Sequence, residues 1–168
     1  MSTKPKPPIE RQSAYWDRWN LKARDAKKLP VSSVRQGNEL VATVAALGRN
    51  NLAILDLGCG SGWAGALLRP YGRVTATDMV AQTIERAKER YPDIDFRCGD
   101  LFEVPLPAEH FDVVVSLEVL SHVADQPAFF ERVANLLKPG GLLLLATQNR
   151  RVYARWSTVA PPDPDQLR

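Results

Sequence analysis

Four residues at alternating positions could do chemistry together: an acid, Asp56, followed by Gly58, Gly60 and Gly62. They end and follow the apolar segment 52–57, which has the length and composition of a buried parallel strand. Glycines after such a strand let the backbone approach a ligand closely, and open α/β sheets bind nucleotides at the carboxyl ends of their strands. The pattern therefore predicts a nucleotide-binding turn.

The register of the glycines bears on which nucleotide binds. Residues 60–65 also fit G-x-G-x-x-G, the fingerprint of dinucleotide-binding folds. That fingerprint starts where its strand ends, and the first glycine after this strand is Gly58. In that register Asp56 would lie beside a pyrophosphate and repel it, whereas it would attract a ligand that carries an ammonium and a sulfonium. We expect a ligand of the second kind rather than NAD.

Asp78 ends the next predicted strand, twenty residues after Gly58. An acid at this place can accept both hydroxyls of a ribose, although NAD-binding folds share the spacing. Asp78 could also cap a helix over residues 80–90. Met79 would then pack on a base or simply fill the core.

The ends of two further strands complete the pattern. Gly99-Asp100-Leu101 follows the strand predicted over 94–97. The segment from Ser116 to His122 covers the last two residues of the strand predicted over 111–117 and the five residues after it. A Gly-Asp pair is also a common turn by itself. With all four strand ends, the sequence resembles the class I S-adenosylmethionine-dependent methyltransferases. Over roughly residues 50–150 it resembles the small-molecule O-methyltransferases of ubiquinone biosynthesis.

The resemblance implies a Rossmann-like α/β core with strand order 3-2-1-4-5, S-adenosylmethionine as the cofactor, and methyl transfer to an oxygen or nitrogen of a small molecule. In this family the acid of the Gly-Asp pair accepts from the adenine amino group, and the backbone of the next residue completes the contact. The cofactor-binding residues implied in this chain are Asp56, Gly58, Cys59, Gly60, Gly62, Asp78, Met79, Asp100, Leu101, Ser116 and Leu117.

Glu118 and His122 are the candidate catalytic residues. They are four positions apart, so a helix there would face both side chains the same way. A carboxylate and an imidazole could remove a proton from a hydroxyl as its oxygen attacks the methyl carbon. His122 could equally pack against the loop without a chemical role, and His110 is expected to face solvent in a turn.

Alternating elements must position these residues. We predict an aromatic lid helix over 10–28 that carries Tyr15, Trp16 and Trp19, and a second helix that begins with capping-box spacing at Ser33 and ends at Gly48. Alternating strands and helices then predict a doubly wound parallel sheet. The predicted strands are 52–57, 73–77, 94–97, 111–117 and 142–147, and the helices between them are 62–69, 80–90 and 127–137.

We expect three parts: a basic segment with the lid helix over 1–30, a cofactor-binding core over 31–148, and an irregular tail over 149–168. The resembling family usually adds a sixth and a seventh strand, for which this sequence has no room. Prolines make the tail unsuited to a strand. The apolar edge 142–145 then needs a cover, so we expect a fragment, a homo-oligomer or a partner at that edge.

Bulk properties limit the class. The 168 residues suffice for one domain, and neither a secretory signal nor a membrane-length apolar run is found, which predicts a cytoplasmic protein that does not enter membranes. Cys59 and Cys98 lack C-x-x-C spacing, so we expect free thiols and no metal. Residues 1–30 carry eight Lys or Arg against three acids, which we interpret as a solvated surface rather than a nucleic-acid site.

Two function classes remain open beside the NAD-binding alternative. The first is a methyltransferase that acts on a small molecule. The second is a truncated or non-catalytic module that binds S-adenosylmethionine without turnover.

Overall fold

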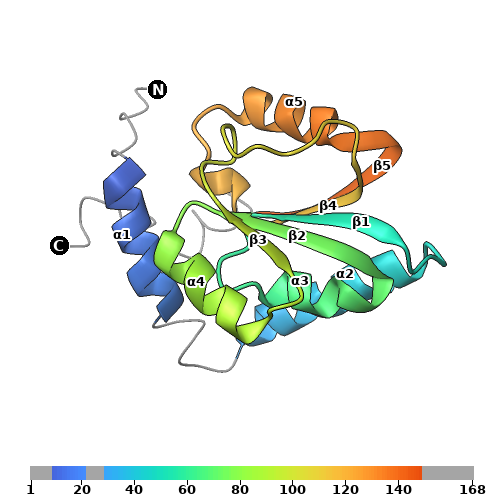
Figure 1. The fold of residues 1–168 in the computed structure, drawn as a ribbon, viewed down its shortest axis with the longest axis horizontal. Coiled ribbons are helices and arrows are strands. Elements are labelled where there is room, and N and C mark those ends of the chain that lie inside the picture. Colours follow the sequence, from blue (N-terminus) through green and yellow to red (C-terminus); the bar gives the residue numbers. More distant parts are fainter. Residues whose placement is uncertain (1–8, 22–28, 149–168) are drawn as a thin grey trace.

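The computed structural model describes residues 9–21 and 29–148, which build a sheet flanked by helices (Figure 1). The α-helices are α1 (Ile9–Asn20), α2 (Val31–Ala45), α3 (Trp63–Leu68), α4 (Ala81–Arg90) and α5 (Gln126–Leu136). Short 3-10 helices follow α3 and β4: η2 (Arg69–Tyr71) and η3 (Leu120–His122). The strands are β1 (Leu52–Leu57), β2 (Gly72–Asp78), β3 (Asp95–Cys98), β4 (Phe111–Leu117) and β5 (Leu137–Ala146).

The five strands form one parallel sheet in the order β3-β2-β1-β4-β5, which confirms the predicted α/β fold and its strand order. The apolar runs of β1 and β4 lie at the centre, where both faces of the sheet are covered. The strand order reverses between β1 and β4, and open α/β sheets bind ligands outside the carboxyl ends of their strands at such a point.

Alternation along the strands divides the core in two. Ile54 and Val113 face α2, α3 and α4, whereas Leu55 and Val114 face α5. Figure 1 shows α2, α3 and α4 on one side of the sheet and α5 on the other. The core that positions the site is thus a sheet between two helical layers.

The predicted elements match the observed ones with two corrections, except that the lid helix predicted over 10–28 is observed as α1 only to Asn20 and residues 22–28 lie outside the described residues. The second helix begins at Val31, with Pro30 as its N-cap and no side-chain cap, so Ser33 is a buried helical residue and not a capping residue. The segment 138–141, which precedes the strand predicted over 142–147, is part of β5. Leu137 already pairs with Phe111, and a register shift absorbs the extra residues before Leu142 pairs with Val113.

An ion-pair cluster supports this early start of β5. Asp112 accepts hydrogen bonds from the Lys138 ammonium at 2.8 Å and from the Ala53 amide at 2.8 Å, and it pairs with Arg49 at 3.0 Å. Burial raises the pKa of Asp112, but these donors outweigh it and lower the pKa to about 2. The cluster ties β5 to β4 at the end of the sheet opposite to the glycine turn.

β5 is an edge strand within the described part of the chain, where it pairs with β4 alone. Its Leu142 is 37% exposed. The expected irregular packing of the tail over 149–168 lies outside the described residues.

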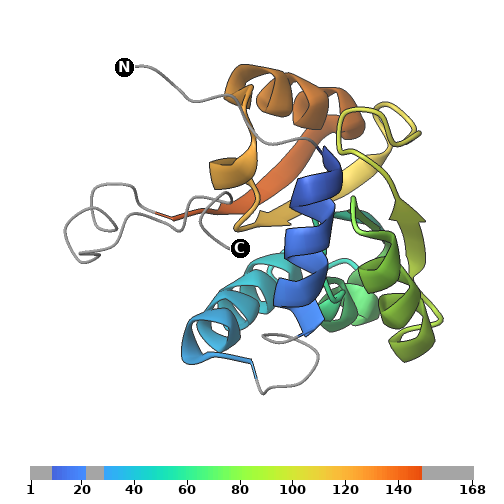
Figure 2. The same cartoon turned by 90° about the vertical axis from the view of Figure 1, so that its left-hand side faces the viewer.

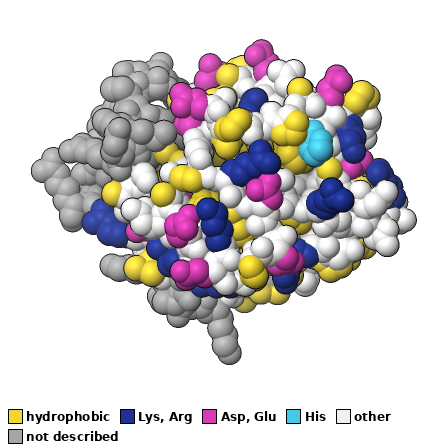
Figure 3. Space-filling model, in the orientation of Figure 1, with side chains coloured by type: hydrophobic (Ala, Val, Ile, Leu, Met, Phe, Trp, Pro, Cys, Tyr) yellow, Lys and Arg dark blue, Asp and Glu magenta, His cyan; other side chains and the backbone are white. Residues whose placement is uncertain are grey.

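The described helices include none that is long and apolar enough to cross a membrane. On the face shown in Figure 3, Lys and Arg side chains are interspersed with Asp and Glu. The solvated surface interpreted for residues 1–30 falls mostly outside the described residues, because six of its eight Lys and Arg lie in 1–8 and 22–28.

Candidate functional site

α1 lies across the carboxyl ends of the strands, as Figure 2 shows. Asp17 holds it to α4: its carboxylate pairs with Arg86 at 2.8 Å and accepts from the Thr83 hydroxyl at 3.3 Å. On the other side, the Trp16 ring meets the His122 ring edge-on, with 4.6 Å between centroids. The predicted lid helix therefore borders both the β2 side and the β4 side of the site.

The glycine turn has the backbone that the sequence predicts. Gly58, Gly60 and Gly62 have φ angles of +81°, +51° and +76°, which side-chain-bearing residues rarely adopt. A Cβ atom on Gly58 would collide with Val119, and one on Gly62 would lie 2.7 Å from Phe96. The turn is thus packed from β3 on one side and from the loop after β4 on the other.

Asp78 locks this turn to the end of β2. Its Oδ2 accepts from the Gly60 amide at 2.9 Å, and its Oδ1 accepts from the Val80 amide at 3.0 Å. Val80, not Asp78, is the N-cap of α4. Burial raises the pKa of Asp78, against the lowering by its hydrogen bonds from Gly60 and Val80. A carboxylate has about four acceptor positions, so these backbone donors leave acceptor capacity for a ligand.

Asp56 points beneath the turn. Its Oδ2 accepts from the Gly65 amide of α3 at 2.9 Å, and the side chain is 2% exposed. Burial raises the pKa of Asp56 to about 7, against the lowering by the Gly65 hydrogen bond, while the charge of Asp78 raises it further. The carboxylate therefore binds α3 directly, and it can affect a ligand only through the electrostatic field of its charge. Cys59 is buried as well.

A cavity of about 720 Å³ lies between α1 and the ends of β2 and β3. This volume suits a nucleoside-sized ligand. The structure brings Met79 and Asp100 together here, as the sequence predicts. The lining residues are Ser13, Ala14, Asp17, Arg18, Met79, Gln82 and Asp100.

Some predicted cofactor residues have mainly structural contacts. The Asp100 carboxylate accepts from the Phe102 amide at 2.8 Å, which shapes the turn. Leu101 packs into the core on the α5 side. Ser116 is fully buried, and its hydroxyl donates to the Leu57 carbonyl at 3.1 Å, which joins β4 to β1. Leu117 packs against the other core cluster.

Glu118 adopts a left-handed conformation, with φ +63°, directly after β4. Its Oε1 accepts from the Gln36 side chain of α2 at 2.8 Å. Its Oε2 is buried and is the one such side-chain oxygen without a hydrogen-bond partner among the described residues. Non-glycine residues in this region are uncommon, and together with an unsatisfied buried oxygen they mark a candidate functional position.

The helical spacing expected for Glu118 and His122 is not present. Because Glu118 is left-handed and η3 begins only at Leu120, the two residues do not share a helix face. Glu118 contacts α2, whereas His122 is exposed and contacts Trp16 of α1. Both residues lie after β4, but their side chains contact different helices.

Three residues of this region carry no clear signal in the sequence. Gln36 is 82 positions from its partner Glu118, and no local pattern marks it. Asp17 and Asn20 lie on the predicted lid helix, where the aromatic residues form the more conspicuous pattern. A polar residue such as Asn20 on the buried side of an amphipathic helix is the one signal that could have been used.

The described residues contain no group of three or more His, Cys, Asp or Glu that could hold a metal ion. Cys98 is exposed and Cys59 buried, and neither forms a disulfide. The donors and acceptors of the site are therefore backbone amides, carboxylates and side-chain amides.

These residues fit an adenosyl ligand. Asp78 has free acceptor positions for hydroxyls, the cavity beside Met79 has the volume for a base, and the buried Oε2 of Glu118 lacks a donor on the β4 side. An ammonium or hydroxyl would satisfy that oxygen.

Comparison with known proteins agrees with this geometry. A family model described as a methyltransferase domain matches residues 55–145. A ubiquinone biosynthesis O-methyltransferase of Rhodopseudomonas palustris (strain HaA2) is 40% identical in an alignment of 110 residues that covers 60% of this chain and 42% of that protein. Another, from Bradyrhizobium diazoefficiens, is 34% identical in an alignment of 154 residues that covers 82% of this chain and 58% of that protein. The chain thus spans about half the length of these curated relatives.

Solved structures share the fold. The DhpI-SAM-HEP complex has a TM-score of 0.68 and 26% identity, covering 95% of this chain and 76% of that chain. The [4+2]-cyclase SpnF also has a TM-score of 0.68, with 19% identity over 84% of this chain and 61% of its own. The second likeness concerns the fold alone.

Proposed function

The chain belongs to the methyltransferase-domain family, and from this premise we propose that it transfers a methyl group from S-adenosylmethionine to an oxygen or nitrogen of a small-molecule acceptor. The observation that carries the proposal is the glycine turn locked by Asp78 beside the cavity that holds Met79 and Asp100. The names of the relatives support the choice of cofactor and, for the ubiquinone enzymes, of an oxygen acceptor.

The strand order suggests how the cofactor lies. The cavity offers space for a nucleoside over the ends of β2 and β3, where Asp78 would accept from the ribose and Asp100 from the base. The amino-acid part would then extend over the ends of β1 and β4, beside Gly58 and Glu118. The cofactor, when bound, supplies a methyl group already activated by its sulfonium.

The protein has to orient the acceptor, exclude water and take up a proton. We propose Glu118 and His122 for the proton, because both lie on the loop after β4 and Glu118 has a free buried oxygen there. α1 would exclude water, since it covers the strand ends and contacts His122. If neither residue takes the proton, methyl transfer depends only on how the protein positions the acceptor against the cofactor.

Calorimetry with S-adenosylhomocysteine tests cofactor binding. Asp78→Asn should weaken binding by about 1–3 kcal/mol, the contribution of hydrogen bonds to a charged group. Gly60→Val should weaken it more, because the side chain would enter the space over the turn. The matched control is Asp95→Asn, an exposed carboxylate on β3 that pairs with Arg97. Tighter binding of NAD than of S-adenosylhomocysteine would refute the proposed cofactor.

Labelled methyl transfer to a catechol probe, 3,4-dihydroxybenzoate, tests turnover. We expect His122→Ala and Glu118→Gln each to lower turnover by about 10²-fold or more, as general-base residues do, with S-adenosylhomocysteine affinity unchanged in His122→Ala. Full turnover in both variants would remove the pair from the mechanism.

The second candidate is a module that binds the cofactor without turnover. It is favoured if S-adenosylhomocysteine binds and a broad screen of hydroxyl and amine acceptors yields no product. Binding and turnover therefore separate the two candidates.

A further inference from the structure

We propose that Asn20, the last residue of α1, accepts a hydrogen bond from the bound cofactor through its side-chain oxygen, which makes α1 part of the cofactor site. This inference rests on the proposed function. It adds a binding residue outside the four strand ends that the sequence indicates.

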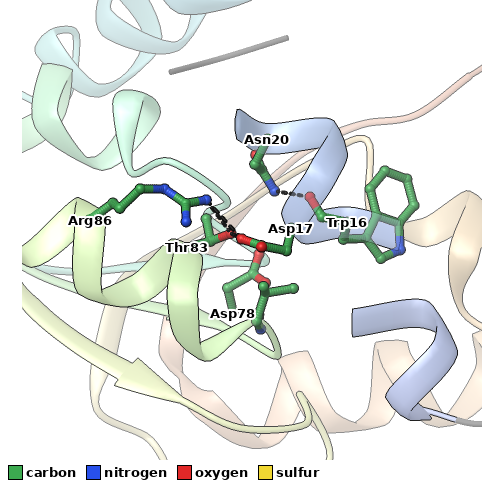
Figure 4. A network of polar contacts seen from close by, with 7 residues as sticks. Trp16, Asp17, Asn20, Asp78, Thr83 and Arg86 are labelled. Carbon is green, nitrogen blue, oxygen red and sulfur yellow. Dashed lines mark hydrogen bonds and ion pairs between the residues drawn. The ribbon is translucent and has the colours of Figure 1, made fainter. Parts of the chain in front are cut away.

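The Asn20 side chain is buried, and of its two polar atoms only the nitrogen has a hydrogen bond within the described residues. The residue is 5% exposed, and its Nδ2 donates to the Trp16 carbonyl at 3.0 Å (Figure 4). Its Oδ1 lies 2.9 Å from the position that a Cβ atom on Gly60 would occupy, so it faces the glycine turn. Within the described part of the chain, no donor is bonded to this oxygen.

The turn itself does not supply that donor. The Gly60 amide is bonded to Asp78, the Gly58 and Cys59 amides to the Thr77 carbonyl, and the Gly62 amide to the Cys59 carbonyl. Among the described residues Glu118 Oε2 alone is a fully enclosed side-chain oxygen without a partner, so Asn20 Oδ1 is not fully enclosed and stays open to a ligand that brings a donor.

α1 holds Asn20 in place over the turn. One helical turn earlier, Asp17 is fixed by Arg86 and Thr83 of α4. Figure 4 shows Asp17 and Asn20 on the same helix above Asp78. A ligand between Asn20 and Asp78 would therefore meet acceptors from both sides, which selects a ligand with several donors.

An adenosyl amino acid has two such donors within reach of the turn: the ribose hydroxyls and the α-ammonium. Both groups can donate a hydrogen bond to the neutral amide oxygen of Asn20. Asn20 can accept from either without a change of charge, so the two sources have to be separated by experiment.

The test is the affinity of Asn20→Ala for two ligands by calorimetry. We expect S-adenosylhomocysteine to bind about five- to tenfold more weakly than to the wild type, the usual effect of one lost hydrogen bond. 5′-Methylthioadenosine keeps the ribose and lacks the ammonium. An equal loss for both ligands assigns the ribose, and a loss for S-adenosylhomocysteine alone assigns the ammonium.

Asn20→Asp separates the oxygen from the amide nitrogen. Asp keeps an acceptor but loses the donor to Trp16, so binding within about twofold of wild type supports the proposal. If Asp binds as weakly as Ala, Asn20 acts only by holding the end of α1, and the proposal is wrong.

Leu21→Ala, at the exposed neighbouring residue, is the matched control for disturbance of the helix end and should bind normally. An equal loss in this control, or wild-type affinity in Asn20→Ala, also overturns the proposal. Failure of the wild type to bind S-adenosylhomocysteine would instead refute the proposed function.

Discussion

Asp56 illustrates at the residue scale how burial changes what a carboxylate does. The sequence places it at the end of β1, which predicts a charge beside a ligand. In the structure the Asp56 carboxylate points toward α3 and accepts a hydrogen bond from the Gly65 amide. A Cβ atom on Gly65 would lie only 3.2 Å from the Asp56 Oδ2 atom, so the carboxylate packs closely against this glycine. Because burial raises its pKa to about 7, Asp56 is partly protonated near neutral pH.

The stability of the protein should therefore depend on pH through Asp56. Its pKa is about 7 in the folded protein and 3.8 for an ordinary aspartate, as in the unfolded chain, so folding favours the protonated form. Its contribution to the free energy of unfolding is fully present below about pH 4 and is lost as the pH rises toward 7. We expect Asp56→Asn to match the wild type near pH 4 and to be more stable at pH 8, because each pH unit between the two pKa values costs the wild type about 1.4 kcal/mol.

Urea unfolding at both pH values measures this difference. Asp93→Asn, at an exposed carboxylate paired with Arg69, is the control and should show no comparable change between the two pH values. A lower stability of Asp56→Asn than of the wild type at pH 8 would contradict the interpretation.

At the scale of elements, the loops after β1 and β4 have to fit each other. Gly58 lies against Val119 so closely that no Cβ fits, and the residue before Val119, Glu118, donates its amide to the Ala146 carbonyl at 2.7 Å. The backbone path that orients Glu118 is thus set by contacts to β1 and β5 rather than by its own sequence.

This packing predicts the effect of Gly58→Ala. We expect a loss of about 2–4 kcal/mol in the free energy of unfolding, from a strained positive φ and from overpacking against Val119. Adding Val119→Ala to Gly58→Ala should remove the loss of stability that comes from overpacking and keep the loss that comes from the strained backbone. Denaturation of both single variants and the double variant measures the coupling, and additive losses would show that the two loops do not constrain each other.

At the scale of the whole molecule, the sheet is covered on both faces but has an open side at β5. The outer backbone of this strand pairs with no other strand among the described residues, and its leucines are only half buried. Unpaired parallel edges favour association with another chain.

We therefore predict self-association through β5. Light scattering over a concentration series should show the mass rising above that of one chain, and Leu142→Lys should suppress the rise. Phe102→Lys, at a residue with 40% exposure away from this edge, is the control and should leave association unchanged. A monomer at high concentration with full methyl-transfer activity would show that the edge needs no cover.

Local patterns in the sequence determined the elements and the class of ligand. The apolar run 52–57 became β1 at the predicted residues, and the acid and glycines after it form the expected turn, because strand propensity and positive φ are properties of a few neighbouring residues. The strand order followed from the family resemblance, and the positions of Asp78 and Asp100 at strand ends followed from the alternation of strands and helices.

Only the tertiary structure decided where the side chains of the candidate site point. The spacing of Glu118 and His122 predicts one helix face, but the contacts of Glu118 with Gln36 and β5 hold it in a left-handed conformation that no local pattern indicates. Likewise, Asn20 faces Gly60 because Asp17 docks α1 on α4. Such contacts join residues far apart in the chain, and their energies depend on the assembled packing, so spacing along the sequence carries no record of them.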